Sequence, residues 1–553
     1  MPMVQDSEIK ARDDRDMASQ ELNQALWNAA NVMRSTMSAD EYKDYLLGLI
    51  FYKYLSDRQL YAVVDLLEDR KPESLDEAQL LYEEARQSED WEDLKAELEE
   101  NYSFAIEPQY TFTALYNEIN NKTFTTDHLR QAMRDIEQGG EAIRGQKLYE
   151  DLFEDFDIDS KSLGTTPAKR NAMLSDVMKE LAHIDFTQYG ADALGDAYEF
   201  LIGQFAAGSG KKAGEFYTPQ AVSELITRIV TKDKEGEPAF SIYDPCMGSG
   251  SLLLHARSYI HEDCRNGIQF FGQEISHTTY NLARMNMILH NVPFQYQHFR
   301  NGDTLGADWP TEEPTNYDAT VMNPPYSQHW SAAAGFLTDP RFQRYEKLAP
   351  KSKADFAFLL HGFYHLKDNG TMGIVLPHGV LFRGAAEGTI RKHLLEDGNI
   401  YAVIGLPAGI FFSTGIPTCI IVLKKNHQSR DVLFIDASKE FRKEKAQNFM
   451  DAEHIDKIMA AYNERKDVDK FAHLATFEEI KENDYNLNIP CYVDTSEPEP
   501  EVDLKAVCAE MQSIDADIQQ TAKELFDMST NLTCQDRETE ESLAELLKVL
   551  QEG

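Results

Sequence analysis

The chain has 553 residues and a mass of 63.0 kDa, which is too long for one ordinary hydrophobic core and predicts two or three domains. Hydrophobic residues make up 42% and charged residues 27%, as in soluble globular proteins, and no apolar run is long enough for a membrane helix. The formal net charge of −40 argues against a protein that holds DNA on a basic surface of its own.

The opening residues are charged throughout and lack the apolar centre of a signal peptide, so we expect a cytoplasmic protein. The six cysteines show no CxxC spacing and no histidine at metal-ligand spacing. They therefore predict reduced, mostly structural thiols and no metal site.

Residues 1–165 are rich in Leu, Glu, Gln and Ala at helical spacing, which predicts an all-helical domain, either a plain bundle or one with a binding role. Between about residues 181 and 425, short apolar strands alternate with helical patterns. That alternation predicts a mostly parallel sheet with helices on both faces, which we assign to a catalytic domain at residues 166–480. The predicted fold class is therefore α/β.

After Glu440 we expect no further strand, and residues 481–553 are assigned to a linker and a helical tail. In this tail, mostly apolar residues recur at alternating spacings of three and four, as in one stripe of a helix: Leu504, Val507, Met511, Ile514, Ile518, Thr521 and Leu525. The stripe either packs on its own domain or docks on another subunit. Residues 496–553 hold 15 acids and 4 bases, so we do not expect the tail to bind DNA.

A glycine-containing turn is the first chemical signal. A buried strand that ends at Asp244 is followed by a tight turn through Gly248, Ser249 and Gly250 and then by a helix. Glycines let the backbone approach a ligand closely, although this pattern also fits a dinucleotide site or a plain strand–helix turn. The next strand ends at Glu274, where an acid can accept hydrogen bonds from ribose hydroxyls. Together they predict a nucleoside-containing cofactor.

A second signal follows the strand Tyr317–Met322, which runs directly into Asn323, Pro324, Pro325 and Tyr326. Two prolines exclude helix and sheet pairing, so the segment is a stiff bracket in which the Asn323 amide and the Pro324 carbonyl are acceptors. Both acceptors together can hold the two hydrogens of a planar amine, whose lone pair stays free to attack a methyl group, while Tyr326 stacks on the base. We therefore predict that this segment binds an aromatic NH2 group.

Five segments in one order resemble the adenine-specific DNA methyltransferases in which an FYTP segment precedes the glycine turn. They are GEFYTPQAV (214–222), DPCMGSGS (244–251), FFGQE (270–274), NGDTL (301–305) and NPPY (323–326). The later segments and the helical domain before the core resemble, more narrowly, the methylating subunit of type I restriction systems. The resemblance implies a Rossmann-like methyltransferase core with a seven-stranded, mostly parallel sheet, S-adenosylmethionine as methyl donor and adenine N6 as acceptor.

The same resemblance gives each matching residue a role. The methionine side of the cofactor would be lined by Glu215, Phe216, Tyr217, Thr218, Pro219 and Gln220, and the glycine turn with Asp244 would wrap the cofactor. Glu274 would hold the ribose, and Asp303 would accept from the cofactor's adenine amino group. Phe411 and Phe412 either pack against an extruded target base or belong to the core. A basic cluster after NPPY either contacts DNA phosphates or is a solvated loop; it comprises Arg341, Arg344, Lys347, Lys351 and Lys353.

The motifs allow some other interpretations and exclude two. The segment GSGKK (208–212) lacks the spacing and the following Ser or Thr of an ATP-binding loop. Cys246 lies inside the glycine turn, unlike the nucleophile of the cytosine C5 methyltransferases. The amine acceptor could instead be a cytosine amine or a protein glutamine amide, and the chain could be a non-catalytic subunit that only binds cofactor.

No segment predicts a domain that reads DNA bases, because the residues after the last expected strand are acidic and largely helical. We therefore expect a separate specificity subunit to read the double-stranded DNA, docked by the helical stripe or by the N-terminal helices. The resemblance implies two methylating subunits for each specificity subunit, and an ATP-driven restriction subunit. The target adenine must be flipped out of the duplex, at a cost of about a few kcal/mol.

Overall fold

The computed structural model describes residues 20–67, 72–143, 145–189, 191–208, 217–306, 316–411, 415–427, 429–444, 447–495 and 503–552. The chain forms two compact units, Met1–Asp494 and Thr495–Gly553. A division of the first unit near residue 165 stays a prediction. None of the helices in the described ranges has the length and apolar content that crossing a membrane requires.

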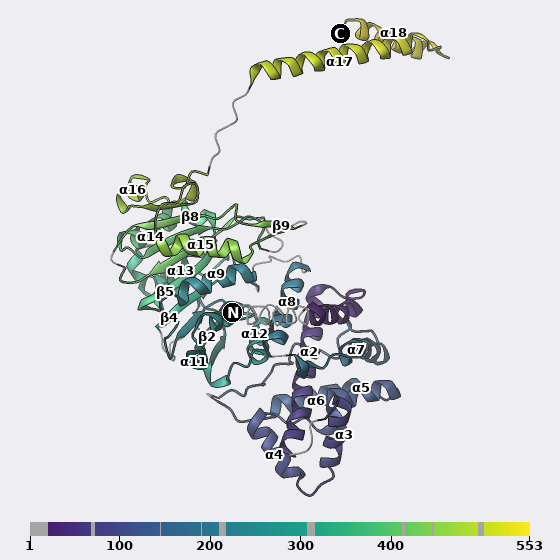
Figure 1. The fold of residues 1–553 in the computed structure, drawn as a ribbon, viewed down its shortest axis with the longest axis vertical. Coiled ribbons are helices and arrows are strands. Elements are labelled where there is room, and N and C mark those ends of the chain that lie inside the picture. The colour runs from purple at the N-terminus through teal and green to yellow at the C-terminus, as the bar shows by residue number, and fades with distance from the viewer. Residues whose placement is uncertain are drawn as a thin grey trace, which may run out of the picture. The chain divides into compact units, whose positions relative to one another are not determined.

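The first unit begins with the predicted helices (Figure 1). Residues 20–34 are helical, and α2 (Ala39–Leu66), α3 (Leu75–Ala85), α4 (Trp91–Tyr102), α5 (Phe112–Asn121), α6 (Thr126–Gln138) and α7 (Pro167–Ala182) follow. The sequence gives α2 a defined start, because the Glu41 carboxylate accepts a hydrogen bond from the Ser38 backbone N–H at 3.0 Å.

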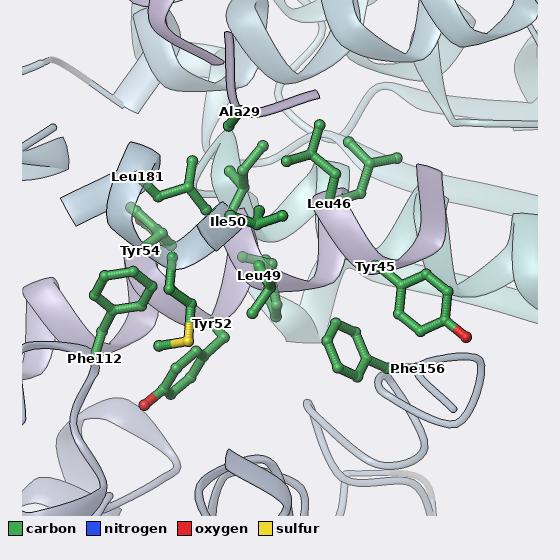
Figure 2. Close-up of a cluster of buried hydrophobic side chains, with 14 of the residues drawn as sticks. Ala29, Tyr45, Leu46, Leu49, Ile50, Tyr52, Tyr54, Phe112, Phe156 and Leu181 are labelled. Carbon is green, nitrogen blue, oxygen red and sulfur yellow. The ribbon is translucent and has the colours of Figure 1, made fainter. Parts of the chain in front are cut away.

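The long helix α2 is the centre of the helical core. Figure 2 shows Leu46, Leu49 and Ile50 of α2 in the middle of a buried apolar cluster, with Phe112 of α5 and Leu181 of α7 beside them. Burial of these side chains on several faces of one helix explains why its apolar residues do not follow a single stripe in the sequence.

One ion pair lies inside this core. Lys53 and Asp57, one turn apart on α2, are 1% and 0% exposed, and their Nζ and Oδ2 atoms are 2.6 Å apart. The Lys53 ammonium also lies 4.9 Å from the centre of the Phe112 ring and 5.1 Å from that of Phe186. Burial raises the pKa of Asp57 to about 6, although Lys53 opposes the shift. Each charge therefore depends on the other, because neither is hydrated.

The described residues include a nine-stranded sheet in the order β11-β8-β6-β7-β5-β4-β1-β2-β3. Its strands are β1 (Ser241–Asp244), β2 (Gln269–Glu274), β3 (Gln297–Asn301), β4 (Tyr317–Met322), β5 (Leu366–Pro377), β6 (Ile400–Gly405), β7 (Thr418–Lys424), β8 (Val432–Asp436) and β11 (Ala472–Ala475). Strands β3, β2, β1, β4 and β5 run parallel, as do β6 and β8. Strand β7 is antiparallel to β5 and β6, and β11 is antiparallel to β8. A separate hairpin pairs β9 (Arg442–Glu444) with β10 (Gln447–Phe449).

The predicted α/β class is confirmed, but the seven-strand count and the end of the strands at Glu440 are wrong. Strands β8 and β11 extend the sheet beyond β6, and β9, β10 and β11 all follow Glu440. The two edge strands give little sequence signal: β3 is only partly buried, and β11 has four residues. An edge strand has one neighbour and less cover, so it does not need the apolar run of a central strand.

Helices cover both faces of the sheet, as predicted. One apolar cluster contains residues of α9 (Gln220–Thr231), α10 (Ser251–His255) and α15 (Ala452–Glu464), and another contains residues of α13 (Asp355–Tyr364), α14 (Ala385–Glu396) and α16 (Phe477–Glu482). Successive β6 residues alternate between them, with Ile404 in the first and Val403 in the second. The short helix α11 (Glu262–Arg265) precedes β2.

Two helices connect the N-terminal helices to the sheet. The helical core includes Tyr198 of α8 (Ala191–Gly208) and Met285 of α12 (His277–Leu289). Helix α2 packs on α8, α8 packs on α12, and α12 contacts β2 and β3. The N-terminal helices therefore reach the sheet through continuous packing beside β2.

The second unit consists of α17 (Leu504–Thr530) and α18 (Arg537–Glu552), which pack on each other. The predicted stripe lies on α17, and its apolar residues are exposed within this unit; Met511 and Ile518 are 60% and 58% exposed. The spacing correctly predicted the helix, but the unit itself does not cover the stripe.

Candidate active site

The carboxyl ends of four neighbouring strands carry the predicted site residues. Strand β1 ends at Asp244 and β2 at Glu274, β3 leads to Asp303, and β4 runs directly into Asn323. Since β4, β1, β2 and β3 are parallel neighbours, these ends meet at one edge of the sheet. The site is therefore assembled by strand order.

The glycine turn has the backbone conformation that its sequence predicts. Gly248 and Gly250 have φ values of 53° and 80°, in the left-handed region that favours glycine. The Gly248 N–H donates to the Glu274 carboxylate at 3.2 Å, and the Ser276 N–H donates to its other oxygen at 2.9 Å. These bonds fix the Glu274 carboxylate against the turn, and burial raises its pKa.

A cavity of about 460 Å³ opens at this edge; it is called the large cavity here to distinguish it from a small cavity beside it. Glu274, Asp303 and Asn323 line it, together with Cys246 and Pro325. Burial raises the pKa of the Cys246 thiol well above its usual value, so this cysteine is a poor nucleophile. That direction agrees with the prediction that Cys246 serves the turn and not a cytosine ring.

Sequence reasoning missed two residues of the large cavity. Asp40 and Lys43, from the first turns of α2, also line it. Nothing in their sequence context marks them, because they lie more than 200 positions before the glycine turn. They reach the cavity through the packing of α2 on α8 and of α8 on α12.

A second, small cavity shares Cys246 and Asn323 with the large cavity. It is lined by Tyr217, Thr218, Asp244, Cys246, Met247, Gly248, Ser249, Ser251, Leu252 and Asn323. Two of its buried polar atoms, Asp244 Oδ2 and Ser251 Oγ, have no hydrogen-bond partner among the described residues. Burial raises the pKa of Asp244 well above its usual value. The Asp244 Oδ1 atom accepts from the Cys246 N–H at 2.9 Å, so the carboxyl group has one oxygen left for a ligand. A ligand with a cationic donor would favour the charged form that burial disfavours.

Asn323 lines both cavities and is only 7% exposed. Its amide nitrogen donates to Thr218 Oγ1 at 3.2 Å, and its amide oxygen accepts from the Tyr326 hydroxyl at 2.7 Å. Phe411 is buried in the core, and its ring meets the Tyr326 ring edge to face at 6.2 Å. A direct contact of Phe411 with a target base stays a prediction.

The FYTP segment is divided between two places. Thr218 lines the small cavity, and Tyr217 lines both that cavity and a third one of about 590 Å³. Pro219 and Gln220, at the start of α9, line the third cavity but neither the large nor the small one. Glu215, Phe216 and Phe412 lie outside the described residues.

The structure contradicts the predicted phosphate contact of Arg341. Its side chain is buried and 2% exposed, and its guanidinium bonds Asp339 Oδ2 at 2.7 Å. It also donates to the Thr304 carbonyl at 3.0 Å, beside Asp303. Arg341 therefore supports the loop that carries Asp303, and a charge run alone did not reveal its burial.

The other members of the basic cluster differ in exposure. Arg344 is exposed but pairs with Asp397. Lys347 and Lys351 are exposed and Lys353 is half-buried. A phosphate contact stays a prediction for these three lysines.

Two family models match the chain. The N-6 DNA Methylase family matches residues 189–501, which include the glycine turn and the NPPY segment. The HsdM N-terminal domain matches residues 22–181, which include α2 to α6 and all but the last residue of α7. The two matches together cover the sheet and most of the helical core.

The curated relatives described next are all named as methylase subunits of type I restriction enzymes. The type I restriction enzyme MpnII methylase subunit of Mycoplasma pneumoniae is 35% identical over 87% of this chain and 91% of its own length. The MjaVIII methylase subunit of Methanocaldococcus jannaschii is 32% identical over 85% of this chain and 78% of its own. The EcoKI methylase subunit of Escherichia coli is 28% identical over 42% of this chain and 44% of its own.

Solved structures agree with these relatives. The crystal structure of a type I restriction-modification methyltransferase subunit from Streptococcus thermophilus is 60% identical, with a TM-score of 0.83, over 86% of this chain and all of that chain. A structure from a study of type I complex assembly shares the fold at 20% identity and a TM-score of 0.56, over 93% of this chain and 99% of that chain. The chain belongs to the methylase subunits of type I restriction enzymes, within the N-6 DNA methylase family, and is an adenine-specific DNA methyltransferase.

Proposed function

We propose that the large and small cavities together bind S-adenosylmethionine, and that Asn323 holds the N6 amine of a flipped-out adenine beside the methyl group. The observation that supports this most strongly is the position of Asn323, which begins the NPPY segment and, like Cys246, lines both cavities. A target amine held at Asn323 would therefore lie next to a cofactor that occupies both cavities.

The residues present fit this cofactor. The large cavity offers the Glu274 and Asp303 carboxylates as acceptors for ribose hydroxyls and an adenine amino group. The small cavity, of about 10 Å³, would have to widen to admit the methionine part, whose ammonium would then meet the Asp244 Oδ2 atom. When bound, S-adenosylmethionine supplies an activated methyl group, because its sulfonium sulfur departs as a neutral thioether.

The protein's contribution to transfer is positioning. The Asn323 oxygen and the Pro324 carbonyl would accept the two amine hydrogens, and Tyr326 would stack on the base, so that the nitrogen lone pair faces the methyl carbon. The amine so held would receive the methyl group that the cofactor supplies, and its proton would pass to solvent. Pro324 and Pro325 follow β4 without strand or helix pairing, as a stiff bracket requires.

We also propose that a specificity subunit reads the DNA sequence, that two methylating subunits serve one specificity subunit, and that a restriction subunit completes the complex in the cytoplasm. The relatives' names support the type I assembly. The charge of −40 argues that this chain needs help to hold DNA. The exposed stripe of α17 is a candidate dock for the specificity subunit.

Replacing Asp244 with asparagine tests the cofactor site. Asp244→Asn keeps the shape but removes the charge that would pair with the cofactor's ammonium. We expect the Kd for S-adenosylmethionine, measured by isothermal titration calorimetry, to rise about 10- to 100-fold, since a hydrogen bond to a charged group is worth about 1.5–3 kcal/mol. Asp233→Asn, on an exposed turn where the residue has a positive φ of 65°, is the matched control and should leave the Kd unchanged. Equal affinities for wild type and Asp244→Asn would refute this assignment.

A further inference from the structure

Two hydroxyl groups hold the Asn323 amide from opposite ends. Thr218 Oγ1 lies 3.2 Å from the amide nitrogen, and the Tyr326 hydroxyl lies 2.7 Å from the amide oxygen. Thr218 and Asn323 are both 7% exposed, so these bonds are largely shielded from water. The contact joins the FYTP segment to the NPPY segment, which are 105 residues apart.

Only one orientation of this amide can receive an amine. An amide oxygen accepts hydrogen bonds, whereas an amide nitrogen only donates. Rotating the Asn323 side chain by half a turn exchanges the two, so the amide nitrogen would then face the hydrogens of the target amine and repel them. Catalysis at Asn323 therefore requires that the productive orientation be held.

We propose that Thr218 is a positioning residue that fixes the orientation of the Asn323 amide, with the Tyr326 hydroxyl as its counterpart. This inference rests on the proposed function of Asn323 and gives the FYTP threonine a role beyond lining the methionine side of the cofactor. A phenol hydroxyl is a stronger donor and a weaker acceptor than an aliphatic hydroxyl, as its pKa near 10 reflects. The pair therefore favours the amide oxygen on Tyr326 and the amide nitrogen on Thr218, as observed.

The backbone around both hydroxyls is well suited to this task. Thr218 directly precedes Pro219, the residue before α9, and α9 packs on β4 and β5. Tyr326 directly follows the two prolines after β4. Both hydroxyls are thus attached to restricted backbone on neighbouring elements, so that little freedom is left to the amide between them.

Removing the threonine hydroxyl should weaken the hold on the productive orientation. In Thr218→Val, the amide nitrogen loses the acceptor that Thr218 supplies, so the productive orientation loses stability relative to other positions of the side chain. In Tyr326→Phe the amide oxygen loses its donor, but the nitrogen keeps the Thr218 acceptor.

The test measures single-turnover methyl transfer by the enzyme assembled with its specificity subunit, at saturating S-adenosylmethionine and duplex DNA. We expect Thr218→Val to lower the rate about 5- to 50-fold, which is about 1–2.3 kcal/mol at about 1.4 kcal/mol per tenfold. The Kd for S-adenosylmethionine should stay within about threefold, which also shows that the variant is folded. Thr218→Ser should recover most of the lost rate, and Thr231→Val, a buried threonine at the far end of α9, is the matched control.

The double variant gives the sharpest result. In Thr218→Val with Tyr326→Phe, neither hydroxyl holds the amide, so we expect the rate to fall below that of Thr218→Val alone. A Thr218→Val rate within twofold of wild type, a loss explained by weaker cofactor binding, or a double variant as fast as Thr218→Val alone would each overturn the inference. Asn323→Ala distinguishes failure of the proposed role of Asn323 from failure of the positioning role of Thr218. If Asn323→Ala is inactive while Thr218→Val is normal, only the positioning role is wrong.

Discussion

Asn323→Ala is expected to lower the kcat for DNA methylation about 100- to 1000-fold, the range seen when one preorganised polar group is removed from a reacting centre. The substitution removes the acceptor that would hold the target amine at a residue that lines both cavities. Because the Asp244, Glu274 and Asp303 carboxylates remain, the Kd for S-adenosylmethionine should change by less than about threefold. Tritiated methyl transfer to DNA by the complex with the specificity subunit measures the first quantity, and calorimetry measures the second.

Asn463→Ala is the matched control, since Asn463 lies exposed near the end of α15. It should keep the wild-type kcat. If Asn323→Ala methylated DNA at the wild-type rate, the target amine would have to be held elsewhere, and the assignment of Asn323 would be wrong. If its cofactor affinity collapsed instead, Asn323 would serve the cofactor and not the base.

Lys53→Met is expected to lower the free energy of unfolding of the first unit by about 3–5 kcal/mol, because it leaves Asp57 buried without its partner. The apolar surroundings, with the Phe112 and Phe186 rings close by, cannot solvate the carboxylate. The urea unfolding transition of this unit, followed by circular dichroism, measures the loss. Lys169→Met, on the exposed side of α7, should change stability by less than about 0.5 kcal/mol.

Lowering the pH should reduce the stability loss caused by Lys53→Met. The pKa of Asp57 in the folded protein, about 6, is above its ordinary value of 3.8, so the folded state binds this proton more tightly than the unfolded state. Removing Lys53 removes an interaction that lowers this pKa, which then rises further. The deficit of Lys53→Met should therefore shrink as the pH falls toward about 6, below which Asp57 is protonated in both folded proteins. Replacing both residues, as in Lys53→Met with Asp57→Leu, should recover most of the stability; a double variant as unstable as the single one would contradict the account.

The sequence predicts those residues of the site that are marked by a pattern within one short segment. Gly248 and Gly250 adopt the left-handed conformation that marks their turn, and Glu274 and Asn323 each stand at the end of an apolar strand. A strand end followed by an acid or by Asn-Pro-Pro is a local pattern. Parallel strand order then brings such ends to the same edge of the sheet.

The parts that sequence did not predict depend on contacts between distant segments. Asp40 and Lys43 reach the large cavity only because α2 packs on α8, and the Thr218 hydroxyl reaches Asn323 only through the packing of α9 on β4. Arg341 belongs to a basic run in the sequence, yet its partners Asp339 and Thr304 bury it. Charge in a sequence does not tell whether a side chain has a buried partner.

Labelled product analysis tests the central claim most directly. The chain is incubated with tritiated S-adenosylmethionine and duplex DNA, alone and with its specificity subunit, and the DNA is digested to nucleosides. We predict label in N6-methyldeoxyadenosine from the assembled enzyme and little or none from the chain alone. Label in N4-methylcytosine or on protein, or equally fast sequence-specific transfer by the chain alone, would contradict the account.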